Sequence, residues 1–250
     1  MSVPCILSTA ARSSTLPGAY GGLLRSRVLC PCSITRKMSS RRQMDHLERT
    51  ASNYRQDRVY PARVCGIMDE SETVKRLRLA VHPDFTFRAG QCPGLLQREG
   101  VIELACTVDS HVAMRVGGNF FFDPLPSDPC VDLLLVAGGV GINPLYSILL
   151  HAADLLRQNP ANKTIIDVCK EFPEKFSCDF HITAQTADID QELQPYMNRG
   201  RLSEGELRHH VDPNTTLCYL CGPPPMIESM VQTLLSLGLS RDRILFEKWW

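Results

Sequence analysis

The sequence predicts two folding units, a small antiparallel β domain followed by an α/β domain with a parallel sheet and helices on both faces. Three observations support this fold class. Residues 131–250 alternate short apolar strands with amphipathic helices, which is typical of a parallel sheet. Residues 58–130 show short strands of partly alternating polarity. A loop rich in Pro and Asp, residues 123–129, separates the two units and marks the expected boundary.

Residues 1–44 have a different composition from the rest of the 250-residue chain. They hold seven Arg or Lys, eight Ser and no Asp or Glu, although the whole chain has a formal net charge of zero. An Arg- and Ser-rich segment without acidic residues is typical of a mitochondrial transit peptide, so we expect a mitochondrial protein. A disordered leader on a cytoplasmic protein is the alternative. The segment lacks interleaved aromatic residues, and no nucleic-acid partner is expected.

The β domain shows four clear strand patterns and one weaker one. Four or five strands in 73 residues are few for a closed barrel, so we expect an incomplete barrel with an open edge. The four patterns are Arg63–Ile67, Val74–Val81, Val101–Val108 and His111–Val116, and the weaker one is Phe87–Gln91.

The α/β domain begins with the apolar strand 131–137 and the helix 144–157. Ser203 followed by Glu206 predicts a capping box at the start of a helix over 203–210. Gly238 is expected to end a helix over 224–237. The segment 164–172 fits either a helix or a strand. The other expected strands are Phe180–Ala184, Thr216–Leu220 and Arg243–Phe246.

A glycine cluster connects the first strand of the α/β domain to its first helix. Glycine allows positive φ angles and lets the backbone approach a pyrophosphate closely. We expect Asn143 to cap the helix and Pro144 to occupy its first position, which presents free amide groups to an anion. The cluster consists of Gly138, Gly139, Val140, Gly141, Ile142 and Asn143.

Other interpretations of this segment remain open. The spacing differs from the Gly-x-Gly-x-x-Gly of dehydrogenases, so a tight turn with a purely structural role is an alternative. A transmembrane helix over 131–150 is disfavoured, because three Gly, one Asn and one Pro interrupt it and no basic residues flank it.

The eleven cysteines form no disulfide framework and are interpreted as reduced thiols. Cys218 and Cys221 have the spacing of a metal or redox pair, but residues three apart on a strand point to opposite faces. No second pair completes a zinc site, and we expect no metal.

Four motifs in order resemble the ferredoxin–NADP reductase superfamily over roughly residues 45–250. They are Phe-Arg-Ala-Gly-Gln (87–91), Gly-Gly-Val-Gly-Ile-Asn-Pro (138–144), Cys-Gly-Pro-Pro-Pro-Met (221–226) and Phe-Glu-Lys-Trp-Trp (246–250). The resemblance implies FAD in the β domain, NAD(P)H in the α/β domain, and hydride transfer between nicotinamide and flavin.

The same resemblance implies roles for individual residues. The glycine turn would bind the dinucleotide phosphates, and Cys221, Gly222 and Pro223 would lie beside the nicotinamide ring. Glu247 would lie near Cys221, and the terminal Trp250 would stack on the flavin. Glu247 as an ordinary surface carboxylate is the alternative.

The family pattern has two gaps in this chain, one in the β domain and one in the α/β domain. Residues 92–100 lack an Arg-x-Tyr-Ser-like strand, and only Asp109 and Ser110 stand where a second flavin segment belongs. About 20 residues after helix 144–157 are too few for a strand, a helix and another strand, so one β–α unit is missing.

These observations predict a flavin-linked NAD(P)H oxidoreductase whose electron acceptor the sequence does not specify. Residues 185–188 offer no Arg or Lys for a 2′-phosphate, which favours NAD over NADP. The missing segments predict poor FAD binding, and the alternative is a non-catalytic NAD-binding or interaction module.

Overall fold

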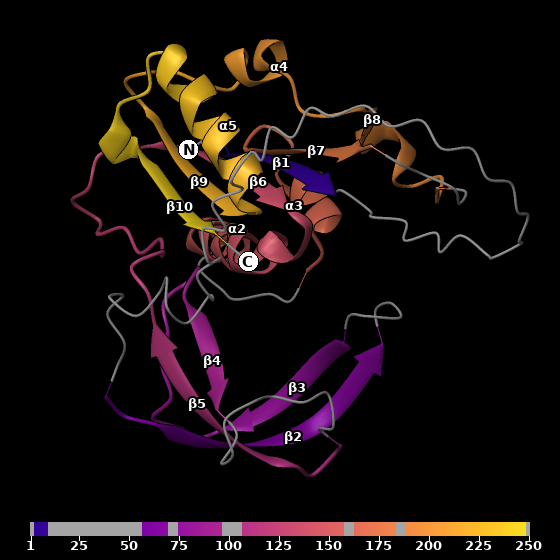
Figure 1. Ribbon diagram of the computed structural model, residues 1–250, viewed down its shortest axis with the longest axis vertical. Helices are drawn as coiled ribbons and strands as arrows, with labels where there is room; N and C mark the ends of the chain where they lie inside the picture. The colour runs from indigo at the N-terminus through magenta and orange to yellow at the C-terminus, as the bar shows by residue number, and fades with distance from the viewer. Residues whose placement is uncertain are drawn as a thin grey trace, which may run out of the picture.

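The computed structural model describes residues 3–9, 57–69, 75–96, 107–157, 163–183 and 189–248. They form a parallel sheet with helices on both faces and a separate antiparallel sheet, which lie at opposite ends of the molecule (Figure 1). Helix α2 (Ile142–Arg157) lies on the side of the parallel sheet that faces the antiparallel sheet (Figure 1). This arrangement confirms the predicted fold class.

The parallel sheet has six strands in the order β10-β9-β6-β1-β7-β8. Leu133 and Leu135 of β6 face the core under α2 and α3, whereas Leu134 and Val136 face the core under α4 and α5. This alternation has the period of two that a strand buried on both faces requires. The strands are β1 (Val3–Thr9), β6 (Asp132–Gly138), β7 (Phe176–Ile182), β8 (Met197–Arg199), β9 (Thr216–Gly222) and β10 (Ile244–Lys248).

Among the described residues, four helices and three 3₁₀ turns accompany these strands. The capping box predicted at Ser203 and Glu206 is present at the start of α4. Gly238 has a φ of +92° and ends α5 as expected. The remaining helices are α3 (Ile165–Glu171), α4 (Glu204–Arg208) and α5 (Pro224–Ser236), with 3₁₀ turns η1 (Gly139–Gly141), η2 (Gln194–Tyr196) and η3 (Arg241–Arg243).

Strand β1 lies in the middle of the sheet, although its residues belong to the expected leader. It pairs in parallel with β6, where Leu7 is aligned with Ala137, and with β7, where Leu7 is aligned with Phe180. The segment after α2 that the sequence left open is the helix α3 and supplies no strand there. β1 therefore lies between β6 and β7, which precede and follow the place of the missing β–α unit in the sequence. The rest of the leader lies outside the described residues, and the transit peptide stays a prediction.

The antiparallel sheet has the order β3-β2-β5-β4. Its core is one cluster of four buried residues, Ala62, Val64, Val112 and Met114. In the described residues the sheet is open, with β3 and β4 at its edges. The strands are β2 (Tyr60–Asp69), β3 (Lys75–Val81), β4 (Cys92–Leu96) and β5 (His111–Gly117).

Two of the strands predicted in this domain, at 87–91 and 101–108, have no strand in the described residues. The weak pattern at Phe87–Gln91 is not a strand, and β4 begins only at Cys92. A turn forms instead, because Gly90 has a φ of +98° and the Gln91 side chain accepts a hydrogen bond from the Arg88 amide at 2.9 Å. The strand expected over 101–108 lies mostly outside the described residues, and the two described residues, 107 and 108, are not in a strand.

Residues 120–122 lie in the connection from β5 to β6 and pack against the parallel-sheet domain. Phe120 and Phe122 are buried in the core cluster that also holds Leu133 and Leu145. The Tyr219 hydroxyl donates a hydrogen bond to the Phe121 carbonyl oxygen at 2.8 Å. The division at 123–129 stays a prediction, and the packing of the α/β core extends back to residue 120.

Candidate nucleotide-binding site

The two glycine turns of the parallel-sheet domain meet at one edge of the sheet. Strands β6 and β9 are direct neighbours and run in parallel, with Ala137 aligned with Cys221. Their carboxyl ends therefore emerge side by side, and each leads into the N-terminus of a helix, α2 or α5. In open α/β sheets, ligands bind outside the carboxyl ends of the strands.

Glycine is required where the two turns touch. A Cβ atom added to Gly222 would lie 3.1 Å from the Cα atom of Gly138. A Cβ atom on Gly141 would overlap the carbonyl oxygen of Cys221, and one on Gly138 would overlap the sulfur of Met226. The backbones of the two turns are thus in direct contact, with Met226 packed beneath the first turn.

Gly139 differs from these three glycines. It is exposed, has a φ of +56°, and a Cβ atom added there would meet no atom within 4 Å. The left-handed backbone favours glycine, and the open space lies next to the first turn of the helix. Amide groups of a first helical turn have no partner within the helix and favour an anion. The open side of this turn is therefore a candidate anion-binding site.

The helix after the turn begins earlier than predicted. Ile142 already has helical angles, with φ −62° and ψ −33°, and α2 starts there after the 3₁₀ turn η1. The prediction that Asn143 caps the helix is therefore wrong, because the glycine turn continues directly into helical backbone. Asn143 is exposed in the first turn, and Val140 is half-buried beside it.

Cys221 and Glu247 are adjacent across the sheet. Cys221 on β9 is fully buried and is aligned with Glu247 on β10. Burial raises the pKa of Glu247, and no hydrogen bond or ion pair of its carboxyl group is found among the described residues. The structure thus brings these two candidate residues together as the resemblance implied. Pro223, half-buried, precedes α5 at the N-cap position.

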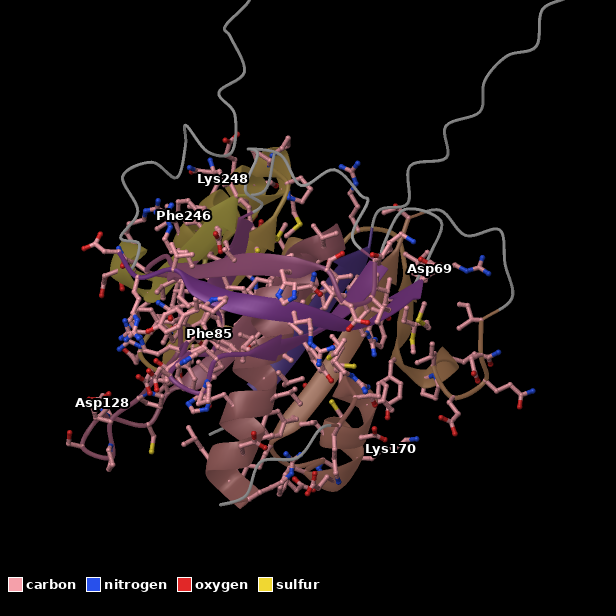
Figure 2. All side chains as sticks on the ribbon, turned by 90° about the horizontal axis from the view of Figure 1, so that it is seen from below. Asp69, Phe85, Asp128, Lys170, Phe246 and Lys248 are labelled. Atoms are coloured by element: carbon pink, nitrogen blue, oxygen red, sulfur yellow. The ribbon has the colours of Figure 1, made fainter. Side chains whose placement is uncertain are left out.

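Strand β10 continues past Glu247 to Lys248. Lys248 forms an ion pair with Glu228 of α5 at 2.9 Å, and its ammonium group lies 5.7 Å from the centre of the Phe246 ring. Figure 2 shows Phe246 and Lys248 close together on β10. The candidate residue Trp250 lies outside the described residues.

The Cys218–Cys221 pair does not form a joint site. Cys218 belongs to the core under α4 and α5, and Cys221 to the core under α2 and α3. Their predicted placement on opposite faces is confirmed. Within the described ranges, no cluster of three or more His, Cys, Asp or Glu side chains could hold a metal ion. No helix in these ranges is long and apolar enough to cross a membrane.

Two features of the site were not predicted from the sequence. Met226 belongs to the Cys-Gly-Pro-Pro-Pro-Met motif, and its contact with the glycine turn arises from tertiary packing. The turn at residues 88–91 packs on α2, since a Cβ atom on Gly90 would lie 2.9 Å from the Cδ1 atom of Ile148. The Arg88 guanidinium lies 3.5 Å from the centre of the Phe121 ring. The Phe-Arg-Ala-Gly-Gln motif was the available signal for this contact.

Fold and site together define a pyridine-nucleotide-binding domain of the oxidoreductase type. Residues 135–232 match the model of the oxidoreductase NAD-binding domain family. The protein from Danio rerio called oxidoreductase NAD-binding domain-containing protein 1 is 55% identical, over 85% of this chain and 100% of the relative. The Homo sapiens protein of that name is 43% identical, over 87% of this chain and 88% of its own length. The chain belongs to the family of oxidoreductase NAD-binding domain-containing protein 1.

Solved structures agree on the fold. The Amycolatopsis cytochrome P450 reductase GcoB superposes with a TM-score of 0.60 at 19% identity, covering 76% of this chain and 69% of that one. The flavohem-like FAD/NAD-binding domain of nitric oxide dioxygenase from Vibrio cholerae O1 biovar El Tor gives a TM-score of 0.56 at 18% identity, covering 76% and 98%. Both show a ferredoxin reductase-like fold.

The relatives also bear on the missing segments. The Bos taurus protein of the family, 41% identical, aligns with all of this chain and 96% of its own length over 308 positions. Because this chain has only 250 residues, about 58 of those positions have no residue here. Internal segments present in the relative are therefore absent from this chain.

Proposed function

We propose that the chain is an NAD(P)H oxidoreductase that binds the dinucleotide at the paired glycine turns and takes part in flavin-linked hydride transfer. The observation that carries the proposal is the direct contact between the turns after β6 and β9, with the open side of Gly139 beside them. Bound nicotinamide would supply or accept the hydride. The electron acceptor is left unassigned.

Each candidate residue would have a positioning role. Amide groups from Gly139 to Ile142 would bind the pyrophosphate, and Cys221 and Gly222 would support the nicotinamide. The Glu247 carboxyl group, partly buried beside Cys221, would hold a proton more readily than an exposed carboxylate. A catalytic role for Glu247 and for Trp250 rests on the family resemblance alone.

The flavin part of the proposal rests on the resemblance and on neighbours whose names include FAD. The described β domain fits a flavin poorly, because its sheet is open and the sequence lacks both flavin-gripping segments. This mismatch, with the absent internal segments, favours a second candidate function, an NAD-binding module without flavin chemistry.

Two finer proposals follow from the sequence. We propose a preference for NAD over NADP, since residues 185–188 contain no basic side chain. That segment is outside the described residues. We also propose a mitochondrial location on the composition of residues 1–44.

The visible spectrum of the purified full-length chain separates the two candidate functions. Flavin absorbance that bleaches on addition of NADH supports the oxidoreductase. A colourless, cooperatively folded protein whose melting temperature rises with NADH supports the binding module. A protein that shows neither effect contradicts both candidates. The same titration with NADPH tests the nucleotide preference.

A matched pair of glycine variants tests the site itself. Gly139 and Gly200 both have positive φ angles and open space where a Cβ atom would lie, so alanine strains both backbones without a clash. Only Gly139 belongs to the glycine turn that follows β6. We expect Gly139→Ala to weaken NADH binding about tenfold or more, which is ~1.4 kcal/mol or above, while Gly200→Ala keeps wild-type affinity. Equal affinities for the two variants would place the nucleotide elsewhere.

A further inference from the structure

Two buried thiols lie close together outside the nucleotide edge. Cys169 on α3 and Cys178 on β7 are 6% and 5% exposed, and neither forms a disulfide. They belong to the same core cluster, in which α3 packs on β7. Lys170, the neighbour of Cys169 in the sequence, is labelled in Figure 2.

The two thiol side chains are neighbours in the core between α3 and β7. A side-chain hydrogen bond with Cys178 lowers the pKa of Cys169, although burial and the nearby Asp179 act in the opposite direction. The thiolate is the nucleophilic form of cysteine, and a lowered pKa increases its population at neutral pH. The first step is therefore assigned to Cys169, and the second step to Cys178, its hydrogen-bond partner.

Other described cysteines have different surroundings. Burial alone raises the pKa of Cys218, which makes that thiol unreactive. Cys65 is exposed and its thiol donates to the Arg78 carbonyl oxygen at 3.3 Å. Cys130 is also exposed. Cys169 thus differs from these three cysteines because it is buried and has a second thiol as its neighbour.

We propose that Cys169 and Cys178 form a reversible redox pair, which a small peroxide oxidises to an intramolecular disulfide that ties α3 to β7. The Cys169 sulfur attacks one peroxide oxygen, the O–O bond breaks, and a sulfenic acid and water form. The Cys178 sulfur then attacks the Cys169 sulfur, and the S–O bond breaks with release of a second water. In sum, two thiols lose two hydrogen atoms and one peroxide becomes two waters.

The local structure suits this reaction. The two sulfurs must approach to about 2.05 Å, which requires a small movement of one element. Helix α3 has seven residues and is connected to β7 by the short segment 172–175, so the closed loop is small. The low exposure of both residues admits a small peroxide more readily than a bulky disulfide such as oxidised glutathione.

Peptide mapping of the full-length chain tests the pair. The protein is treated with hydrogen peroxide, free thiols are alkylated, and the chain is digested with trypsin. We expect peptide 164–170 to be joined to peptide 176–199 in most molecules, and a dithiol reductant to separate them. Cys218→Ser should leave this link unchanged, and Cys169→Ser should abolish it.

Three results would overturn the proposal. In the first, both cysteines of the peroxide-treated protein are still free and become alkylated. In the second, Cys169 is oxidised to the sulfinic acid and no disulfide forms. In the third, Cys178 forms a disulfide with Cys5, its aligned residue on β1. The mapping of the wild-type chain decides the question even if Cys169→Ser does not fold. The proposal is independent of nucleotide binding, so the spectral test above does not affect it.

Discussion

The parallel-sheet domain and the antiparallel β domain differ in how they bury their strands. Strand β6 has six consecutive buried residues and is covered on both faces, whereas no residue of β3 is fully buried. The parallel sheet supports two core clusters, and the antiparallel sheet supports one with four buried residues. The α/β domain thus buries its sheet on both faces, whereas the described residues of the β domain form an open sheet over one small core.

Core truncations test this difference most strongly. Leu149 of α2 is fully buried, and Leu149→Ala should cost about 2–5 kcal/mol of unfolding free energy. Val64 is the matching fully buried residue of the β domain, and Val64→Ala removes two methyl groups, or about 1.6 kcal/mol. Denaturant titration monitored by circular dichroism measures both. A larger loss at Val64 would mean that the β domain contributes more stability than its small core indicates.

Strand β1 tests whether the parallel sheet depends on its central strand. Leu7→Pro removes a backbone donor between β6 and β7 and should cost at least about 1–3 kcal/mol, because a partner group is left unpaired. The wild-type chain is the control. Equal melting temperatures for Leu7→Pro and the wild type would show that the sheet forms without β1.

Glycine substitutions compare backbone contacts in the two domains. Gly141→Ala places a Cβ atom against the Cys221 carbonyl oxygen and should cost about 1–3 kcal/mol, with loss of NADH binding. Gly66→Ala in β2 places a Cβ atom 3.5 Å from the Cβ of Arg78, an ordinary contact, and should be nearly neutral. Thermal melts and NADH titrations read both effects. An unchanged melting temperature and NADH affinity in Gly141→Ala would contradict the contact between the two turns.

Tyr219 tests the junction between the domains and has the smallest expected effect. Tyr219→Phe removes the hydrogen bond to Phe121 and should cost about 0.5–1.5 kcal/mol at neutral pH. Burial raises the pKa of Tyr219 to about 12 from 10.0, so unfolding releases a proton between these values. Its stabilising contribution is therefore complete below pH 10 and falls as the pH rises toward 12. Stability curves of the wild type and Tyr219→Phe should converge over this range, and parallel curves would contradict the assignment.

Local signals account for the parts of the fold that the sequence predicted correctly. The apolar run 131–137, the Ser203–Glu206 capping box and Gly238 each determine their structure through neighbours in the sequence. The Thr164–Asp167 capping box is a similar signal that would have assigned α3 as a helix. Strand β1 could not be predicted in this way, because its partners β6 and β7 are more than 120 residues away.

The candidate site follows the same division. The glycines at 138, 139 and 141 were predicted from turn chemistry, which depends on local backbone needs. The Met226 sulfur under Gly138 and the contact of Gly90 with Ile148 depend on how separate elements pack. The helix start at Ile142 was missed because glycine flexibility allowed the turn to continue into the helix.

The burial of Phe120 and Phe122 in the core of the parallel-sheet domain has a practical consequence. A fragment that starts at Val131 would lack both rings and leave a cavity beside Tyr219, which contacts each of them. Recombinant production of the nucleotide-binding half alone should therefore start upstream of Phe120. The shorter fragment would expose apolar surface that the intact chain buries, and it should aggregate more readily.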